Sequence, residues 1–311
     1  MNAASPLEAR LRAIGAKRYH HRHPFNLRMH AGTLAREELQ SWVANRYYYQ
    51  TRIPLKDGLI LAKSGDPAFR RDWIGRIHDH DGTPEREGGL ALWLALARAV
   101  GLDVERVAKL ADVLPGVRRA CDAYVEFVES HDLLASVASS LTEMFAGDIM
   151  GERIAAFEKH YPWVDADGLR YFRSRTVQAP ADARYGLAFV VEHARTREDQ
   201  DRCAAALERK CEILWGLLDA IEHAHAVPRF AGAAQARLDD PEPLVVLPER
   251  AVKLSGSARE ILALVDGRRT AIQVAAAVSS RHPEVESVAD DVHDFLDEMV
   301  RLGVIERGAR P

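Results

Sequence analysis

The sequence of 311 residues has little cysteine and no long apolar run. Its cysteines, Cys121, Cys203 and Cys211, are odd in number and lack Cys-x-x-Cys spacing, which argues against a disulfide framework or a zinc finger. No stretch approaches the roughly 18 apolar residues that a membrane helix needs, and the opening MNAASPLEARLRA carries charges. We therefore expect a cytoplasmic protein without a signal peptide or a membrane span.

Short catalytic and nucleotide-binding motifs are also missing. The chain has no Gly-x-Gly-x-x-Gly turn after a strand, no phosphate loop, and no Gly-x-Ser-x-Gly nucleophile elbow. A net charge of −4 gives no basic excess for nucleic acid. With 47% apolar residues, the composition is that of a globular protein with one large or two smaller domains.

Residues 1–226 predict an all-helical domain, because their apolar residues recur with the helical period. Every Trp and Tyr lies in this part, so any aromatic pocket belongs to it. The expected joints between helices are Pro24, Pro67, Pro84, Pro115, Pro162 and Pro180. Residues 227–243 contain the acidic DDPEP run and predict a linker or a shortened hairpin.

Residues 244–311 predict a small α+β domain that resembles a winged helix. Two short strands flank Pro248, and a capping box of Ser257 and Glu260 begins a first helix that Asp266–Gly267 ends. A second helix follows Thr270, a third spans Val288 to Met299, and Val304–Ile305 returns as a strand.

The charges of this small domain argue against DNA binding. Residues 244–311 carry 11 acids against 9 bases, and the stretch 284–298 has seven acids without Lys or Arg. A peptide or protein partner, taken up along an exposed strand edge, fits better. The alternative is a structural appendage that aids solubility or dimerisation.

One helical stripe in the first domain is unusually polar. Trp42, Arg46, Tyr49, Gln50 and Ile53 share a face, because residues three and four apart on a helix are neighbours. An unpaired Arg46 would be costly to bury, so we expect an anion or a carboxylate to meet it.

Two further stretches offer cations to the interior. Tyr171 and Arg175 are one helical turn apart and can reach the same ligand, whereas Arg173 faces the solvent. Lys210 lies on the apolar seam of its own helix, where it either reaches out to water or pairs with an acid. Like charges gathered in one pocket indicate a polyanionic ligand, a polycarboxylate or a phosphate.

The histidines do not follow metal-ligand spacing. A carboxylate-bridged two-metal bundle needs an acid and a His three residues apart on each of two helices, but Glu192–His193 and Glu222–His223 are adjacent. We therefore expect no metal site, and structural roles for His160, His282 and His293.

Seven stretches between residues 15 and 225 resemble the pyrroloquinoline quinone (PQQ) synthase family, PqqC. These are YHHRHPFNLRMHAG, WVANRYYYQTRIPLKD, RIHDHDG, LPGVRRACDAYVEF, SSLTEMFA, HYPWVDADGLRYFRSR and KCEILWGLLDA. The later PERAVKLSGSAREILALVDGRRT and DFLDEMVRLGVI are similar to PqqD, the small chaperone of the precursor peptide in the same pathway. The resemblance implies a natural fusion of the two.

The resemblance implies a mainly α protein, with a heme-oxygenase-like (TenA/PqqC-like) helical bundle followed by a winged-helix-like α+β PqqD domain. It implies the last step of PQQ formation, in which O2 drives ring closure and multi-electron oxidation of a tricarboxylated quinone precursor with release of H2O2. The family does this without a metal, heme or redox cofactor, and it suggests a homodimer. Expected partners of residues 244–311 are a PqqA-like precursor peptide and a PqqE-like radical SAM enzyme.

The family's roles carry over to matching positions of this chain. His80 is expected as base or oxygen-side acid, with His20 and Tyr171 as further proton-transfer groups. Tyr49 and Gln50 would bind the quinone oxygens. Arg46, Arg153, Arg175 and Lys210 would hold carboxylates, and Lys56 and Glu143 would support the site from behind.

Two departures from the family's pattern stand out. The chain has FAGDIMGER where the family has FAPQIHQSR, so Met150 occupies the position of an active-site histidine. Because methionine cannot shuttle a proton, either that histidine is dispensable or the oxygen-activating network runs through His20, His80 and Tyr171 alone, with slower late oxidation steps. The first hairpin of the PqqD-like part is shortened around Asp239 to Pro243, which puts the strength of peptide binding in question.

Three alternative functions remain open at this point. A TenA-like hydrolase of a thiamin-type heterocycle would need a cysteine nucleophile near a carboxylate. A non-catalytic carrier would bind the finished quinone or the peptide without turnover. A metal-dependent oxidase of the same fold would contain a metal.

Overall fold

The computed structural model describes residues 5–308, which form two compact units. The first unit comprises residues 5–113 and 117–218, and the second comprises 114–116 and 219–308. The boundary falls within helix α12 (Arg197–His225), between Leu218 and Asp219.

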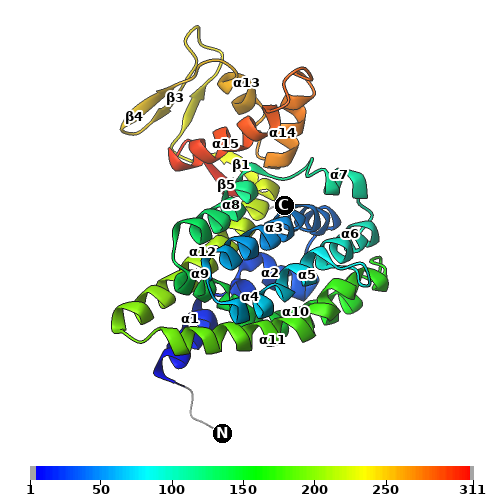
Figure 1. Ribbon diagram of the computed structural model, residues 1–311. Helices are drawn as coiled ribbons and strands as arrows, with labels where there is room; N and C mark the ends of the chain where they lie inside the picture. Colours follow the sequence, from blue (N-terminus) through cyan, green and yellow to red (C-terminus); the bar gives the residue numbers. More distant parts are fainter. Residues whose placement is uncertain (1–4, 309–311) are drawn as a thin grey trace. The chain divides into compact units, whose positions relative to one another are not determined.

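The first unit is built of helices, as predicted. In chain order they are α1 (Pro6–Arg18), η1 (His20–Arg22), α2 (Pro24–Ala31), α3 (Arg36–Lys63), α4 (Pro67–Trp73), α5 (Gly75–Asp81), α6 (Gly89–Ala99), α7 (Val104–Ala108), α8 (Pro115–Ser130), α9 (Leu133–Ser139), η2 (Ser140–Phe145), α10 (Ala146–His160), η3 (Ala166–Leu169), α11 (Arg170–His193) and most of α12. In Figure 1, α11 packs along α10.

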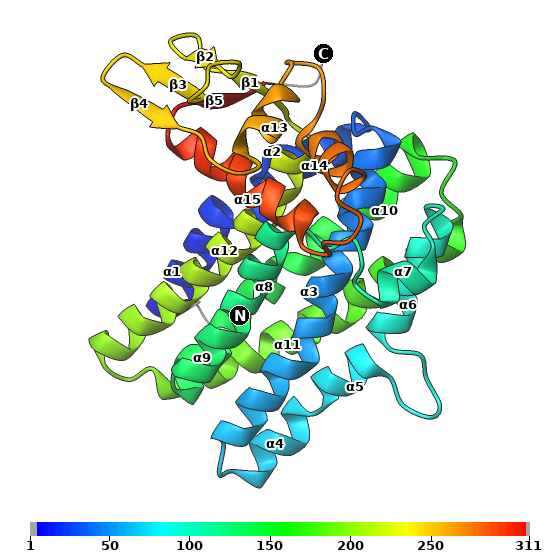
Figure 2. The ribbon, with the colours of Figure 1, turned by 90° about the horizontal axis from the view of Figure 1, so that it is seen from above.

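Helix α3 runs through the middle of this unit, with α9 on one side and α5 and α6 on the other (Figure 2). Its first turn is closed by Glu38, whose carboxylate accepts a hydrogen bond from the backbone N–H of Ala35 over 2.8 Å. Pro54 lies inside the helix, and because proline has no N–H it leaves the carbonyl of Gln50 without its helical donor. That carbonyl belongs to a residue of the predicted site.

The prolines do not all mark joints. Pro24, Pro67 and Pro115 stand at the start of α2, α4 and α8, where a missing N–H does no harm. The expected joint at Pro180 is wrong, because α11 continues through it from Arg170 to His193. This helix packs against α9, α10 and η2.

Within residues 5–308, one segment, Leu133–His160, is long and apolar enough to cross a membrane by length and composition alone. It comprises α9, η2 and α10, and 56% of its most apolar window is buried in the protein. It also carries the buried Arg153. These features are those of a core segment.

The second unit combines two small sheets with three helices. Its elements are β1 (Val227–Phe230), β2 (Gln235–Arg237), β3 (Leu244–Leu247), β4 (Arg250–Lys253), α13 (Ala258–Ala263), α14 (Ala271–Ser279), α15 (Val288–Arg301) and β5 (Ile305–Gly308). β1 pairs with β5, and β2, β3 and β4 form an antiparallel sheet in that order (Figure 2). Val245, Leu262, Val274, Val292 and Val304 lie in its core.

The predicted order of two strands, three helices and a closing strand is confirmed for residues 244–308. Residues 227–243, expected to be a linker or a shortened hairpin, hold β1 and β2, which pair with β5 and β3. Ser257 precedes α13 without capping it, because Glu260 is instead held by Arg281 and His282. The capping box lies one helix later, at Thr270 and Gln273.

Candidate functional site

The predicted site residues all lie in the helical unit, and all but Glu143 are buried. Helix α3 carries Arg46, Tyr49, Gln50 and Lys56; η1 carries His20; α5 carries His80; η2 carries Glu143; α10 carries Met150 and Arg153; α11 carries Tyr171 and Arg175; α12 carries Lys210. The polar stripe of α3 faces inward as predicted, with Trp42 and Gln50 each only 1% exposed.

Lys210 and Arg46 meet at the ring of Tyr49. Lys210 Nζ donates a hydrogen bond to the Tyr49 hydroxyl over 2.9 Å, and the Arg46 guanidinium lies 4.0 Å from the centre of the same ring. Lys210 Nζ also lies 3.1 Å from the centre of the Tyr124 ring. Neither predicted environment of Lys210 is found, since it is 1% exposed and contacts aromatic rings and a phenol instead of water or an acid.

The guanidinium groups of Arg46 and Arg153 are incompletely satisfied. Arg46 Nη1 and Arg153 Nε are buried with no hydrogen-bond partner among residues 5–308. Arg153 does donate from Nη2 to the side-chain oxygen of Asn26 over 3.1 Å, and its guanidinium lies 5.1 Å from the centre of the Trp42 ring. Buried donors without acceptors are costly, so this arrangement is suited to an anion with several oxygens.

The electrostatics of the site reflect an excess of buried positive charge. Burial, with Lys56 and Arg46 nearby, lowers the pKa of Lys210 well below its usual value. Burial and Arg46 lower the pKa of Arg153 to about 10. Burial raises the pKa of Tyr49 well above its usual value, even though Arg46 acts in the other direction. An anionic ligand would reverse the shifts of the cations, so the site gains electrostatic energy when it is filled.

His80 and Tyr171 form the second part of the site. A Cβ at Gly89 would lie 3.3 Å from the Tyr171 ring and 3.6 Å from Cδ2 of His80, which places both side chains against the start of α6. The Tyr171 hydroxyl donates to the side-chain oxygen of Gln50 over 3.0 Å. Burial and Arg175 lower the pKa of His80 to about 4, so its ring is neutral near pH 7.

Arg175 faces acids in this structure. Its Nη2 lies 3.7 Å from Glu143 and 3.4 Å from Asp182, and Glu143 also pairs with Arg76 over 2.6 Å. Its charge is therefore already balanced, and its role in holding a substrate carboxylate stays a prediction. Burial, with Glu143 beside it, raises the pKa of Asp182 to about 6.

Lys56 belongs to a separate polar network behind the site. It donates to Asp57 over 2.6 Å and to Ser140 over 3.1 Å, and Trp73 donates to the same carboxylate over 2.9 Å. The network fixes α3 against η2 and α4, which agrees with the supporting position expected for Lys56.

Met150 lies beside Arg153, one turn away on α10. Its sulfur is 3.9 Å from Nη1 of Arg153, and the residue is 7% exposed. A thioether accepts a weak hydrogen bond and donates none. Position 150 therefore faces the site in this chain without contributing a proton.

The sequence interpretation missed three buried residues of the site. Tyr124 lies over Lys210, Asn26 joins His20 to Arg153, and Arg76 holds Glu143. Arg76 and His80 are one turn apart on α5, a spacing that could have revealed Arg76. Asn26 had no such signal, because its partners lie on other helices, His20 on η1 and Arg153 on α10.

Cysteine and metal chemistry receive no support from the geometry. All three cysteines are buried, and burial raises the pKa of each thiol to about 12, so they are protonated near pH 7. Across residues 5–308, no group of three or more His, Cys, Asp or Glu side chains is placed to hold a metal ion.

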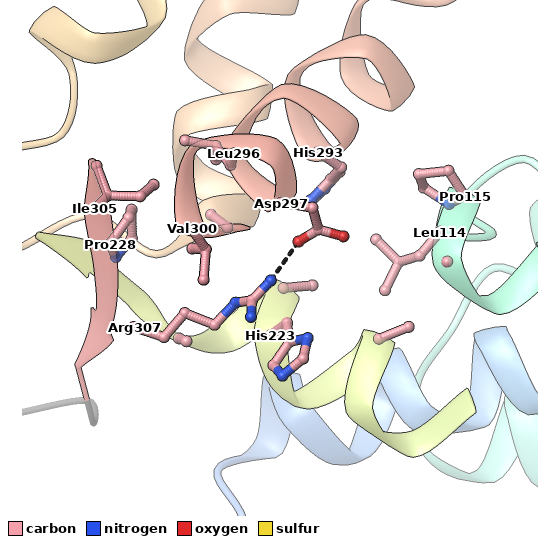
Figure 3. Close-up of a pocket in the computed structure, with 15 residues that line it drawn as sticks. Leu114, Pro115, His223, Pro228, His293, Leu296, Asp297, Val300, Ile305 and Arg307 are labelled. Carbon is pink, nitrogen blue, oxygen red and sulfur yellow. Dashed lines mark hydrogen bonds and ion pairs between the residues drawn. The ribbon is translucent and has the colours of Figure 1, made fainter. Parts of the chain in front are cut away.

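A small cavity within the second unit is another candidate (Figure 3). Arg307 pairs with Asp297 at its edge, His223 lies beside Arg307, and His293 lines it from α15. Its volume of about 30 Å³ has room for about two water molecules. It is too small for a quinone or a peptide side chain of any size, so we assign it a structural role.

Comparison with protein families assigns both parts of the chain. Residues 8–220 match the TENA/THI-4/PQQC family, and residues 244–305 match Coenzyme PQQ synthesis protein D (PqqD). A curated pyrroloquinoline-quinone synthase from Rhizobium meliloti (strain 1021) is 50% identical over 220 residues, covering 71% of this chain and 86% of the relative. Another from Gluconobacter oxydans (strain 621H) is 48% identical, covering 70% and 92%.

Solved structures agree on the fold. A TenA homologue from P. horikoshii OT3 matches with a TM-score of 0.56 at 12% identity, covering 69% of this chain and 97% of that structure. A heme oxygenase-like domain from Shewanella denitrificans OS217 matches with a TM-score of 0.55 at 14% identity, covering 70% and 88%. The predicted heme-oxygenase-like bundle is thus confirmed, whereas the winged-helix detail of the second unit stays a prediction. The chain belongs to the TENA/THI-4/PQQC family and carries a PqqD domain after the family's helical fold.

Proposed function

We propose that the helical unit catalyses the last step of PQQ biosynthesis, the O2-dependent ring closure and oxidation of a tricarboxylated quinone precursor. The observation that carries this proposal is the group of buried cations, Arg46, Arg153 and Lys210, which have no acidic partner among residues 5–308 in their hydrogen bonds and ion pairs. A tricarboxylate supplies the oxygens that these donors lack. The identity of about half the residues to curated synthases supports the same reaction.

Binding and orientation fall to α3, α10 and α12 in this proposal. Arg46, Arg153 and Lys210 hold the carboxylates, and Tyr49 and Gln50 hydrogen-bond the quinone oxygens. Tyr49 keeps its proton because burial raises its pKa well above the usual value, so it serves as a donor to an oxygen on which charge develops.

Proton transfer falls to His80 and Tyr171. With its pKa lowered to about 4, His80 is neutral near pH 7 and can accept a proton from the precursor during ring closure. Tyr171 is tied to Gln50 and lies against the same stretch of α6 as His80, so both reach the same region of a bound ring.

We propose O2 as the oxidant, with no metal or organic cofactor. The precursor carries the electrons, and O2 is reduced to H2O2 beside the buried cations, whose charge stabilises anionic oxygen species.

The test is a turnover assay with purified, chelator-treated protein and the ring-open precursor in air-saturated buffer. We expect PQQ absorbance and peroxide to appear together, and neither product under nitrogen. Elemental analysis of the same sample separates a metal-free enzyme from a metal-dependent oxidase. Stoichiometric binding without turnover would mark a carrier, and no binding would overturn the proposal.

We propose that the PqqD domain binds the precursor peptide along the open edge of β4. The strand order leaves β4 unpaired on one side. The backbone N–H of Leu254 donates to the carbonyl of Pro243 over 2.9 Å, so this pair is hydrogen-bonded across the two strands. Because alternate residues of an antiparallel strand face its partner, the register directs the N–H and C=O of Ala251 and Lys253 to the open edge. These groups can receive an added strand.

Peptide binding at this edge can be tested with Ala251→Pro, which removes one outward N–H without removing a hydrogen bond from the β3–β4 ladder. We expect the affinity for a PqqA-like peptide to fall about tenfold. The matched control is Ala236→Pro on β2, the opposite edge of the sheet. Equal affinity of Ala251→Pro and the unmodified protein would place the peptide elsewhere.

We further propose that the chain acts as a homodimer with a PqqE-like radical SAM enzyme as a partner, and that fusion raises the local concentration of pathway components. Equal PQQ output in cells from the two halves expressed separately would contradict the benefit of fusion.

A further inference from the structure

In both His20 and His80, the ring nitrogen Nδ1 makes a hydrogen bond. Its partner is an acceptor at His80 and a donor at His20. In His80, Nδ1 lies 3.1 Å from the backbone carbonyl of Arg76. A carbonyl oxygen only accepts, so Nδ1 of His80 carries the proton and Nε2 is bare. In His20, Nδ1 lies 3.1 Å from the side-chain nitrogen of Asn26.

The orientation of the Asn26 amide is fixed from two sides. Arg153 donates to one end of it over 3.1 Å, and because arginine cannot accept a hydrogen bond, that end is the oxygen. At the other end the nitrogen donates to the backbone carbonyl of His20 over 2.6 Å. If the amide were flipped, its oxygen would face the carbonyl oxygen of His20 and its N–H groups would face those of Arg153, so this assignment is secure.

The nitrogen of Asn26 can therefore only donate to Nδ1 of His20. That leaves Nδ1 of His20 without a proton and places the proton of the neutral ring on Nε2. Burial and the cations Arg46 and Arg153 lower the pKa of His20, and burial lowers that of His80, which agrees with two neutral rings. Asn26 is 0% exposed, so water does not compete for its amide.

We propose that Asn26 is a positioning residue which, with the Arg76 carbonyl, holds the two site histidines in opposite tautomers. His80 presents a bare Nε2 and His20 presents an Nε2–H. This inference rests on the proposed function, in which one ring accepts a proton and the other donates a hydrogen bond.

The division is specific. A proton leaving the precursor goes to Nε2 of His80, whose Nδ1–H stays on the Arg76 carbonyl, and the electron pair stays on the precursor. His20 donates a hydrogen bond from Nε2–H to an oxygen on which that charge collects, and it is not the base. To act as a base, His20 would need an unprotonated Nε2. The hydrogen bond from the Asn26 amide to Nδ1 keeps the proton on Nε2 instead.

The experiment is a ¹⁵N–¹H correlation spectrum of the ligand-free protein with labelled histidine, in which His20→Gln and His80→Gln assign the two rings. We expect a pyridine-type Nδ1 and a pyrrole-type Nε2 for His20, and the reverse for His80. The same tautomer in both rings, or a charged His20 ring near pH 7, would overturn the proposal. This spectrum needs no variant of Asn26 and no turnover.

Asn26→Asp tests the role of the amide directly. A carboxylate only accepts, so we expect the two nitrogen shifts of His20 to exchange while those of His80 stay in place. The control is Asn45→Asp, the same change at a buried asparagine that donates to the Ser41 carbonyl, and it leaves both rings unchanged. An Asn26→Asp protein that keeps the Nε2–H form of His20 refutes the positioning role. A chain with opposite tautomers that forms no PQQ refutes the proposed reaction and leaves this assignment standing.

Discussion

Lys210 is buried against Tyr49, and the contact from its Nζ to the phenol oxygen measures 2.9 Å. The two groups have pKa values shifted in opposite directions: burial lowers that of Lys210 and raises that of Tyr49. Both shifts favour the neutral forms, and a carboxylate beside Nζ would restore the charge of Lys210 while keeping Tyr49 protonated. The pair is therefore poised for a change in protonation when an anion arrives.

Binding of the tricarboxylate should take up protons through Lys210. A carboxylate beside Nζ raises the pKa of the amine towards its usual value. At a pH above the pKa that the amine has without the ligand, up to about one proton is therefore bound per site. Calorimetric titrations in buffers with different ionisation enthalpies measure this number. We expect Lys210→Met to abolish the uptake, and Lys109→Met, at an exposed lysine, to leave it unchanged. Uptake that persists in Lys210→Met would assign the proton to another group.

Arg46→Met should separate binding from folding. Because Nη1 of Arg46 is buried without an acceptor, its removal relieves a desolvation penalty, and we expect the ligand-free melting temperature to stay the same or rise. Affinity for the precursor should fall about 100-fold, or about 3 kcal/mol. The control, Arg52→Met, lies further along α3 and loses an ion pair to Asp122, so it should lower stability and spare affinity. A large drop in melting temperature for Arg46→Met would instead indicate a structural role.

Helical periodicity predicted the site residues that share one face of a helix, but not their contacts with other helices. The stripe of Arg46, Tyr49 and Gln50 needs only the spacing of α3, and the structure buries all three. The surroundings of Lys210 depend on Tyr124 and Tyr49, which are distant in sequence, so an acid or water was the expected partner. The pairing of Arg175 with Glu143 was missed for the same reason, whereas Asp182 lies seven residues further along α11 and was within reach of helical spacing.

In the second unit, local signals predicted the three helices and the strands β3, β4 and β5, but not the cap of α13 or the partners of β1 and β2. Thr270, Val288 and Gly303 mark helix ends that the structure retains. The pairing of β1 with β5 joins residues that are far apart in sequence, Phe230 with Ile305 for example, and nothing local predicts such a register. The sequence of residues 227–243 therefore left both a linker and a shortened hairpin open.

Replacing Cys121 by Ala should leave turnover unchanged. The thiol is 0% exposed and burial raises its pKa to about 12, so it is not a nucleophile near neutral pH. We expect a loss of stability of about 1 kcal/mol from the small cavity. Steady-state rates of Cys121→Ala, Cys203→Ala and Cys211→Ala check this. Loss of activity in one variant that remains folded would favour the TenA-like hydrolase.

The pKa of His80 predicts how stability depends on pH. The folded value is about 4 and the unfolded value about 6.5, so the folded protein binds fewer protons between them. The contribution of His80 is thus fully present above pH 6.5 and is lost as the pH falls through 4, by on the order of 3 kcal/mol. Asp182, with its pKa raised to about 6, acts in the opposite direction, since its contribution is lost as the pH rises through 6.

The measurement that isolates His80 is the difference in unfolding free energy between the unmodified protein and His80→Gln from pH 4 to 7. Asp182 titrates in both proteins, so its contribution cancels in this difference. We expect the difference to grow as the pH rises, because only the unmodified protein gains the contribution of His80. His78→Gln, at an exposed histidine two residues away, is the control for the substitution itself. A flat difference for His80→Gln would mean that the folded pKa of His80 is not lowered.

Met150→His should accelerate the oxygen-dependent phase of the proposed reaction. The thioether lies 3.9 Å from Arg153 Nη1 and has no proton to give, whereas an imidazole at the same position could relay one to reduced oxygen. In single turnover, with the precursor bound under nitrogen and then mixed with O2, we expect peroxide to form about tenfold faster. Met150→Leu is the matched control: it keeps the apolar volume and removes only the sulfur, so its rate should equal that of the unmodified protein. If Met150→Leu slows the oxygen phase while Met150→His does not accelerate it, the sulfur itself contributes, and the chain has adapted to methionine at this position.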